Sequence, residues 1–355
     1  MNLEQLGFNE KIRKSIQEQN LESFDLGRII AEHKERYILK TAKEEIDAEI
    51  TGNMRYTAKS REDYPAVGDW VAATVYDTGI AIIHKLLPRY SLIKRQAAGK
   101  PGEIQVIAAN IDFAFIVQSV DRDFNINRLE RYLTICNSSK VIPIIILTKT
   151  DLADKNRIAE ISDKVATRIK NIPVIAISNE TKEGYEEINN IIKKGKTYCM
   201  LGSSGAGKST LLNNLSGRPV MKTDIISFKT HKGRHTTSHR ELIILEKGGI
   251  LIDNPGMREV GITDTEDGLE TTFTEIVSLA KDCKFKNCTH TNEKGCAILE
   301  ALENGEIDIN SYRNFMKMEK EKAHFESTIA ERRKKEKIFG KILKDYHKKD
   351  PKQRR

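Results

Sequence analysis

A chain of 355 residues is longer than one ordinary hydrophobic core, so we expect two or three domains. Its apolar runs are too short to span a bilayer and its N-terminus lacks a secretory signal, so we expect a cytoplasmic protein that does not bind membranes. The net charge of +8 is concentrated in residues 311–355, where 16 Lys/Arg stand against 7 Asp/Glu, and this tail favours an anionic partner, above all nucleic acid, over a merely solvated helix.

The N-terminal part predicts a small β-barrel or sandwich. A short helical lead-in over residues 1–20 is followed by strand-like runs without long helices between them, punctuated by Gly, Pro and Asp. We place this domain at residues 1–88 and a basic linker at 89–104. Trp70 lies in one of the runs, where a core position is favoured over base stacking. The strand-like runs are 36–40, 46–50, 67–76 and 80–86.

From residue 105 the pattern changes to apolar strands that alternate with helices. This alternation predicts a parallel sheet covered by helices on both faces, in a domain over residues 105–262. The remainder, 263–355, is predicted to be helical, with its final stretch from Lys334 to Arg355 frayed. The expected strands are 111–120, 141–147, 172–177, 197–201, 241–246 and 250–252, with a helix at 128–137 after the first.

A complete phosphate-binding loop lies between a predicted strand and a predicted helix. Its glycines let backbone N–H groups curl around a phosphate, and the helix N-terminus adds partial positive charge. Lys208 is expected to reach the β- and γ-phosphates as a catalytic group, and Ser209 to hold Mg²⁺. The loop reads Gly202-Ser203-Ser204-Gly205-Ala206-Gly207-Lys208-Ser209, and Thr210 after it completes the expected phosphate contacts.

Asp253 ends a later apolar strand and is followed by Asn254-Pro255-Gly256. Taken alone, such a sequence is an ordinary turn. Downstream of a phosphate-binding loop it is typical of a switch, in which the Asp completes the Mg²⁺ shell and the Gly256 N–H contacts the γ-phosphate.

A base-selecting element is predicted at Thr148-Lys149-Thr150-Asp151, which again ends a buried strand. It is similar to the Asn/Thr-Lys-x-Asp element of GTPases, in which the Asp accepts hydrogen bonds from guanine N1–H and the 2-amino group. Adenine offers neither donor. Ser178 occupies the next strand end, where it would support the base. Both elements precede the phosphate-binding loop, whereas in ordinary GTPases they follow it, so we infer a circularly permuted GTPase domain.

With these motifs established, the chain resembles the bacterial small ribosomal subunit biogenesis GTPases of type A. This resemblance implies a multidomain protein: an N-terminal oligonucleotide-binding (OB-like) barrel, a central α/β circularly permuted P-loop GTPase domain and a C-terminal α-helical zinc module. Thr148 replaces the commoner Asn, which predicts weaker base contacts, and Asn254 replaces the usual Thr. The motifs that carry the resemblance are 67–71, 105–112, the phosphate-binding loop, 233–237 and a Cys/His cluster.

The segment between the phosphate-binding loop and Asp253 fits a mobile first switch. Thr237 is preferred over Thr236 as the hydroxyl that binds Mg²⁺. Met257 cannot orient a water molecule, so a polar group must come from elsewhere, and His235 is the candidate. The alternative is that His235 contacts only phosphate or solvent. The family resemblance implies that this loop contacts ribosomal RNA and that its histidine helps to place the attacking water.

The Cys/His cluster, Cys283, Cys288, His290 and Cys296, supplies three thiolates and one imidazole within fourteen residues. Four such ligands predict one structural, tetrahedral Zn²⁺, and the alternative is a set of reduced, partly buried cysteines. Cys136 and Cys199 lie in apolar segments and are expected in the core.

Together these features predict a GTPase that binds GTP, GDP and Mg²⁺. Following the resemblance, it would bind the small (30S) ribosomal subunit and its rRNA as a monomer, hydrolyse GTP when stimulated by that subunit, and assist its late maturation. One alternative is an RNA-dependent P-loop ATPase or a kinase, which would be indifferent to guanine. Another is an RNA-binding module with a weak nucleotide site, which would show no turnover.

Overall fold

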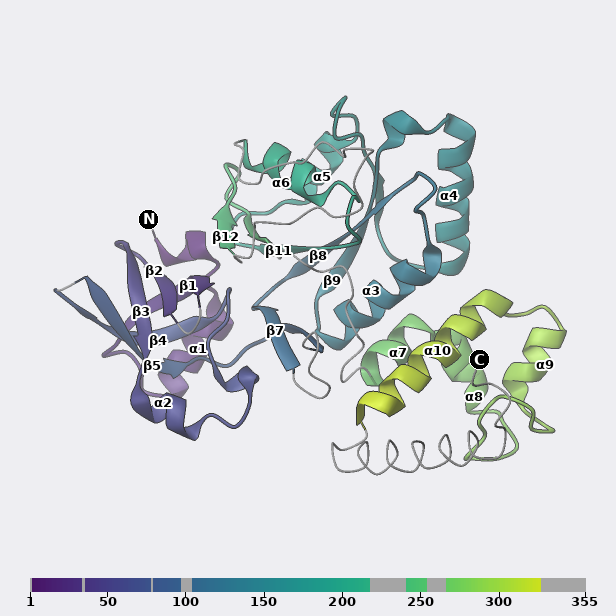
Figure 1. Cartoon of the computed structure of the whole chain (residues 1–355), viewed down its shortest axis with the longest axis horizontal. Coiled ribbons are helices and arrows are strands. Elements are labelled where there is room, and N and C mark those ends of the chain that lie inside the picture. Colours follow the sequence, from purple (N-terminus) through teal and green to yellow (C-terminus); the bar gives the residue numbers. More distant parts are fainter. Residues whose placement is uncertain are drawn as a thin grey trace, which may run out of the picture.

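The computed structural model describes residues 2–33, 36–77, 79–96, 104–217, 241–253 and 266–326. Figure 1 shows three parts: a β-barrel that contains the N-terminal region, an α/β domain in the middle, and a helical module beside α3 of that domain. Within the described residues, no helix is both long and apolar enough to cross a membrane.

The N-terminal part is a closed five-stranded barrel. Its strands follow the order β1-β2-β3-β5-β4, and β4 pairs again with β1, so the sheet returns to its first strand. β3 and β5 run parallel and the other neighbours antiparallel, a five-stranded barrel of the kind that the sequence predicts. The elements are η1 Leu3–Leu6, α1 Glu10–Glu18, β1 Asp25–His33, β2 Arg36–Thr41, β3 Glu45–Ile50, α2 Gly52–Thr57, η2 Arg61–Asp63, β4 Trp70–Tyr76 and β5 Ile80–Leu86.

Trp70 is a core residue, as expected, with 1% of its surface exposed. It packs with Leu6, Ile12 and Ile16 of the lead-in, so this cluster attaches the first helices to the barrel. The ring of Phe8 meets Trp70 edge to face, with 5.5 Å between centroids.

The central domain is built on a sheet with the order β10-β9-β8-β11-β13-β12, in which all neighbours are parallel except β12 and β13. Side chains of α3 and α4 pack on one face, and those of α5 and α6 on the other (Figure 1). The elements are β8 Phe113–Ser119, α3 Ile126–Ser138, β9 Ile142–Thr148, η3 Thr150–Leu152, α4 Lys155–Arg168, β10 Val174–Ala176, α5 Tyr185–Ile191, β11 Thr197–Leu201, α6 Lys208–Ser216, β12 Glu241–Ile244 and β13 Ile250–Asp253.

The segment expected to be a basic linker contains β6 (Leu92–Gln96), which pairs antiparallel with β7 (Ile104–Ala109). This two-stranded sheet leads from the barrel into the central domain. A second connection is direct, because β12 pairs with β13 on one side and, at the single position Glu241↔Ala31, with β1 of the barrel on the other. The barrel and the central domain therefore belong to one hydrogen-bonded sheet.

A buried arginine holds the same junction together. Arg28 of β1 has no exposed surface and donates to backbone oxygens of Leu6 (2.6 Å), Gly68 (3.0 Å) and Asn110 (3.0 Å), and to the Thr197 hydroxyl (2.9 Å). These partners come from the lead-in, the barrel and the central domain. Burial lowers the pKa of its guanidinium. Two of the partners, Gly68 and Asn110, belong to the motifs that carry the family resemblance.

The C-terminal module has its own small core, formed by Leu269, Phe273, Ile298 and Met318 among others. It contacts α3, where Thr272 accepts a hydrogen bond from Asn137 at 3.0 Å. Its helices are α7 Glu266–Thr272, α8 Thr274–Ala280, α9 Ala297–Glu303 and α10 Ile309–Glu326. The stretch from Lys334 to Arg355, expected to be frayed, lies outside the described residues.

Candidate nucleotide site and metal cluster

The predicted nucleotide-binding elements meet at one edge of the central sheet. Parallel strands end at the same edge, and the loops beyond their carboxyl ends are where ligands bind in such sheets. β9 ends at Thr148, β10 leads to Ser178, β11 leads into the phosphate-binding loop, and β13 ends at Asp253. Residues that are distant in the chain are thus neighbours in space, as the inferred permutation requires.

The phosphate-binding loop has the backbone that its glycines permit. Gly202, Gly205 and Gly207 have φ angles of +155°, +78° and +87°. A Cβ at Gly202 would lie 2.2 Å from the Val117 carbonyl oxygen, so only glycine fits there. Lys208, the first residue of α6, donates from Nζ to the carbonyl oxygens of Gly202 (2.8 Å) and Ser203 (2.5 Å). The loop is therefore curled around its own lysine, with Ser209 and Thr210 in the first turn of α6.

Asp151, the predicted base-selecting residue, is oriented by Ser178. The Ser178 hydroxyl donates to Asp151 Oδ1 at 2.6 Å, and Ser178 is buried. The preceding Lys149 has a φ of +62° and directs its ammonium to Asp121 Oδ2 at 3.0 Å. Of the predicted base-binding residues, Thr150 begins the short η3 turn that carries Asp151.

Thr148, the departure from the commoner Asn, is buried and contacts the phosphate-binding loop directly. Its hydroxyl donates to the Ala206 carbonyl oxygen at 2.7 Å. The residue therefore connects the base-selecting element to the phosphate-binding loop.

The loop after β8 supplies two acidic residues that sequence reasoning did not single out. Asp121 pairs with Lys149, and Asp123 accepts a hydrogen bond from the Ser203 hydroxyl at 3.1 Å. A hydrogen bond from Arg128, opposed by burial and reinforced by Ser203, lowers the pKa of Asp123. Both carboxylates follow a buried parallel strand, which was the available signal for their position at this edge.

A further set of polar residues lies behind the phosphate-binding loop, and it too was missed. Asn179 Nδ2 donates to the Gly207 carbonyl oxygen at 3.1 Å, and Asn179 Oδ1 accepts from the Tyr185 hydroxyl at 2.7 Å. The amide of Asn214 in α6 donates to the Tyr185 hydroxyl at 2.7 Å and to the Asn179 carbonyl oxygen at 3.1 Å.

Asp253 lies at the end of β13, opposite Glu241 of β12. Asp253 thus lies at the same sheet edge as the phosphate-binding loop, and its contact with Mg²⁺ stays a prediction. The other predicted switch residues, His235, Thr237 and Gly256, lie outside the described residues.

The four predicted metal ligands converge in the C-terminal module. The ligand atoms of Cys283, Cys288, His290 and Cys296 all lie within 4.8 Å of one another. Cys283 Sγ is 3.6 Å from His290 Nδ1 and 3.9 Å from Cys296 Sγ, and Cys296 Sγ is 3.5 Å from His290 Nδ1. A tetrahedral Zn²⁺ with bonds of about 2.3 Å to sulfur and about 2.0 Å to nitrogen needs separations of roughly 3.5–3.8 Å between its ligands. The cluster can therefore hold a metal ion.

Neighbouring residues fix the ligand loop. The Glu293 carboxylate accepts hydrogen bonds from the backbone amides of Thr289 (2.8 Å) and Thr291 (3.0 Å), and Tyr312 of α10 donates to the His290 carbonyl oxygen at 2.6 Å. Cys136 and Cys199, in contrast, are buried in the core, and burial raises the pKa of the Cys199 thiol to about 12. They are inert core residues, as expected.

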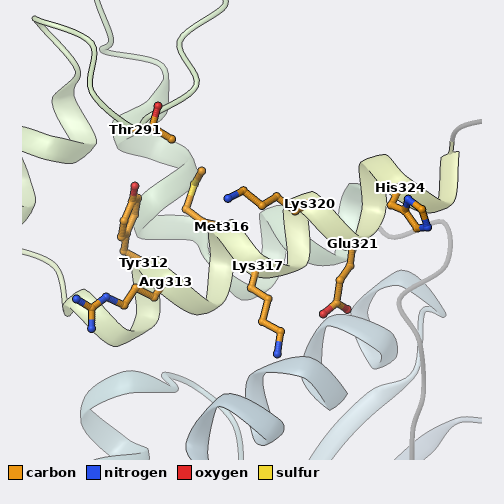
Figure 2. Close-up of a pocket in the computed structure, with 8 residues that line it drawn as sticks. All are labelled: Thr291, Tyr312, Arg313, Met316, Lys317, Lys320, Glu321 and His324. Carbon is orange, nitrogen blue, oxygen red and sulfur yellow. The ribbon is translucent and has the colours of Figure 1, made fainter. Parts of the chain in front are cut away.

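α10 also lines a groove with several basic side chains. The groove has a volume of about 610 Å³. Figure 2 shows Tyr312, Met316 and Lys320 on the side of α10 nearest Thr291, whereas Lys317 and Glu321 point the other way. Glu321 pairs with Arg131 of α3 through two contacts of 2.7 and 2.8 Å. The lining residues are Thr291, Tyr312, Arg313, Met316, Lys317, Lys320, Glu321 and His324.

Comparison with known proteins identifies close relatives. The sequence model of the RsgA GTPase family matches residues 86–263. The small ribosomal subunit biogenesis GTPase RsgA 1 of Bacteroides thetaiotaomicron is 38% identical over 98% of this chain and 97% of its own length. The protein of the same name from Oceanobacillus iheyensis is 43% identical over 85% of this chain and 86% of its own.

Solved structures agree with the fold. YjeQ from Thermotoga maritima superposes with a TM-score of 0.62 at 25% identity, covering 83% of this chain and 96% of that one. YloQ, described as a circularly permuted GTPase, superposes with a TM-score of 0.60 at 24% identity, covering 86% of this chain and 98% of that one. Together with the strand order, these likenesses confirm the predicted fold class of barrel, circularly permuted GTPase domain and helical module.

Proposed function

The chain belongs to the RsgA GTPase family, and from that premise we propose that it hydrolyses GTP on the small ribosomal subunit, is stimulated by it, and assists its late maturation. The observation that carries the proposal is the meeting of the phosphate-binding loop and the Asp151–Ser178 pair at one sheet edge. A serine that holds Asp151 in place favours guanine, which offers two donors to a carboxylate, over adenine.

In this proposal Lys208 and the loop amides of 202–210 bind the phosphates. Thr148, Lys149, Thr150, Asp151 and Ser178 form the base side of the site. Ser209, Asp253 and Thr237 would hold Mg²⁺, which supplies positive charge to the phosphate oxygens, and the hydroxyl and carboxylate oxygens of this set suit that ion. Gly256 N–H would contact the γ-phosphate.

We assign His235 to orient the attacking water. The reason is chemical: the neighbouring Met257 carries a thioether, which cannot do so. Lys208 and His235 are thus the proposed catalytic pair.

We propose that the Cys283, Cys288, His290 and Cys296 cluster binds one structural Zn²⁺. The ligand separations support four-coordinate binding, and three thiolates with one imidazole are a donor set that zinc prefers. The ion would hold together the loop between α8 and α9.

The rRNA contacts are assigned to the barrel, the C-terminal module and the basic tail. The groove on α10, with Arg313, Lys317 and Lys320 among its lining residues, supplies donors for phosphate oxygens. We further propose a cytoplasmic monomer without membrane contacts, with domains at 1–88, 105–262 and 263–355 and a basic linker at 89–104.

The test is hydrolysis of GTP and ATP by the purified protein with small subunits, with large subunits and with neither, at fixed salt. The proposal expects turnover of GTP only, raised strongly by small subunits alone. Equal use of ATP would establish the RNA-dependent ATPase instead. Absence of turnover under all conditions would establish an RNA-binding module.

A further inference from the structure

We propose that Asn179 is a positioning residue that aims the backbone amides of the phosphate-binding loop, and that it sets how long the nucleotide stays bound. This inference rests on the proposed nucleotide site, and it concerns a residue to which no motif of that site assigns a role. Asn179 follows Ser178 directly, but its side chain turns away from Asp151 and toward the loop.

The planar peptide bond explains how a hydrogen bond to the Gly207 carbonyl can orient the next backbone N–H. The carbonyl of one residue and the N–H of the next lie in one plane and point in opposite directions. The Gly207 carbonyl also accepts the Leu211 N–H of α6 at 2.9 Å, and the Asn179 amide is its second donor. Asn179 therefore helps to keep the N–H of Lys208 turned to the opposite side. Thr148 does the same one residue earlier, since it holds the Ala206 carbonyl and so turns the N–H of Gly207. Amides of this loop are the groups that bind phosphate.

The direction of the Asn179 amide is fixed by a one-way series of donors. The Asn214 amide donates to the Tyr185 hydroxyl, which donates to Asn179 Oδ1, and this leaves Asn179 Nδ2 for Gly207. Burial raises the pKa of the Tyr185 phenol to about 12, so it remains a donor at neutral pH. A flipped amide would place its NH₂ against the phenol and its oxygen against a carbonyl.

The first donor of the series, Asn214, lies in α6, the helix that begins at Lys208 directly after the loop. Its amide donates a second bond to the Asn179 backbone oxygen at 3.1 Å. Only 8% of the Asn179 surface is exposed, so its side chain interacts with these protein groups and hardly with solvent. The fit is close: a Cβ at Gly207 would lie 2.6 Å from Asn179 Nδ2, so a side chain there would displace the Asn179 amide.

Dissociation of fluorescent GDP, steady-state hydrolysis and thermal unfolding of the full chain test the proposal. Asn179→Ala removes two side-chain hydrogen bonds, and the loss of the one to the Gly207 carbonyl should speed GDP dissociation about tenfold. The preference for GTP over ATP should be retained, because the Asp151–Ser178 pair is untouched.

Three further variants separate positioning from simple packing. Asn179→Asp keeps the shape but sets an oxygen against the Gly207 carbonyl, so its dissociation rate should exceed that of Asn179→Ala. Tyr185→Phe frees the amide to flip and should lie between wild type and Asn179→Ala. Asn190→Ala, an exposed asparagine of α5, is the matched control and should match wild type.

The outcomes separate cleanly. A dissociation rate within about twofold of wild type in Asn179→Ala, with only a lower melting temperature, would show a structural role and overturn the inference. Loss of the GTP preference would also overturn it. Lys208→Ala tests the site itself: if that variant still binds GDP normally, the proposed nucleotide site is wrong, whatever Asn179 does.

Discussion

At the scale of single residues, Asp151 is the carboxylate that we propose selects the base. It is held by the Ser178 hydroxyl at 2.6 Å, so it presents its remaining acceptor capacity in a defined direction. A carboxylate accepts two hydrogen bonds from guanine, whereas a carboxamide would face one of those donors with its own NH₂.

Asp151→Asn should therefore weaken GTP binding about a hundredfold or more, because a guanine donor is left without an acceptor. The same carboxamide can donate to a base with oxygen in place of the 2-amino group, so xanthosine triphosphate should bind the variant better than wild type. Competition of both nucleotides against fluorescent GDP measures this exchange. Equal GTP affinity in the two proteins would contradict the assignment of Asp151.

We expect Asp123 to contribute to the free energy of unfolding in a pH-dependent way. Its folded pKa is lowered, so the contribution is complete above the unfolded value of about 3.9 and is lost as the pH falls through the folded value. The melting-temperature difference between wild type and Asp123→Asn should be constant from about pH 8 to about pH 5 and shrink below about pH 4. Because the carboxylate side chain is 48% exposed, the difference should be small. A difference that grows on acidification would contradict this.

At the scale of elements, α3 connects the nucleotide edge with the C-terminal module. It begins just after the loop that carries Asp123, and Glu130 in its second turn is buried, with 2% exposed. Glu130 accepts two bonds of 2.8 Å from Arg168 of α4 and one of 2.5 Å from Asn314 of α10. Three helices thus meet at one carboxylate.

Glu130→Ala should loosen the docking of α10, since it leaves the Arg168 guanidinium, 11% exposed, with only Asp308 at 3.6 Å as an acidic partner. We expect a cost of at most about 3 kcal/mol. Amide hydrogen exchange should rise in α10 and at the end of α4, while GDP still binds. Glu160→Ala breaks an exposed pair with Arg157 in the same α4 helix and should leave exchange unchanged. Unchanged protection of α10 in Glu130→Ala would refute the role given to this contact.

Much of the fold could be predicted from the sequence, for reasons visible in particular elements. Runs bounded by turn residues predicted strands close to β3 and β5, where buried and exposed residues alternate, as in a strand with one face on a core. They also predicted strands close to β8, β9 and β11, because buried parallel strands are continuously apolar. β1 was missed, since Gly27 and the buried Arg28 interrupt its alternation. β6 was predicted as part of a linker, because its basic residues suggest a solvated segment.

Some residues of the candidate site could be predicted from the sequence and others could not. Motif residues such as Lys208, Asp151 and the four Cys/His ligands were found because their spacing along the chain is diagnostic. Asp121 and Asn179 were missed, since their contacts join loops that meet only after the strands have taken their order in the sheet. Thr148 was predicted to weaken the site, and no spacing rule shows that its hydroxyl reaches Ala206.

At the scale of the whole molecule, the barrel and the GTPase domain are joined through Arg28. Its four bonds end on three different parts of the chain, so none of these parts can move alone without leaving a buried acceptor unpaired. The chain has one tryptophan, Trp70, which reports on the barrel side of this junction.

Arg28→Met should separate unfolding into two steps. Leu6 O and the Thr197 hydroxyl lose the bond that Arg28 donates, whereas Gly68 O and Asn110 O keep bonds from the Asn110 amide and the Tyr90 hydroxyl. The cost, on the order of 2 kcal/mol, falls on the junction. Trp70 fluorescence should then change at lower denaturant concentration than release of bound fluorescent GDP, whereas the two should coincide in wild type. Arg13→Met, on the exposed surface of α1, is the control. Coincident transitions in Arg28→Met would show that the two parts do not depend on this side chain.

The single pairing between β12 and β1 has a mechanical consequence. Glu241 is paired with Asp253, the proposed Mg²⁺ contact, on one side and with Ala31 of the barrel on the other. Strand pairing is thus continuous from Asp253 through Glu241 to Ala31, and no loop lies between these three positions. A rotation of β13 would therefore be passed through Glu241 to β1 and the barrel.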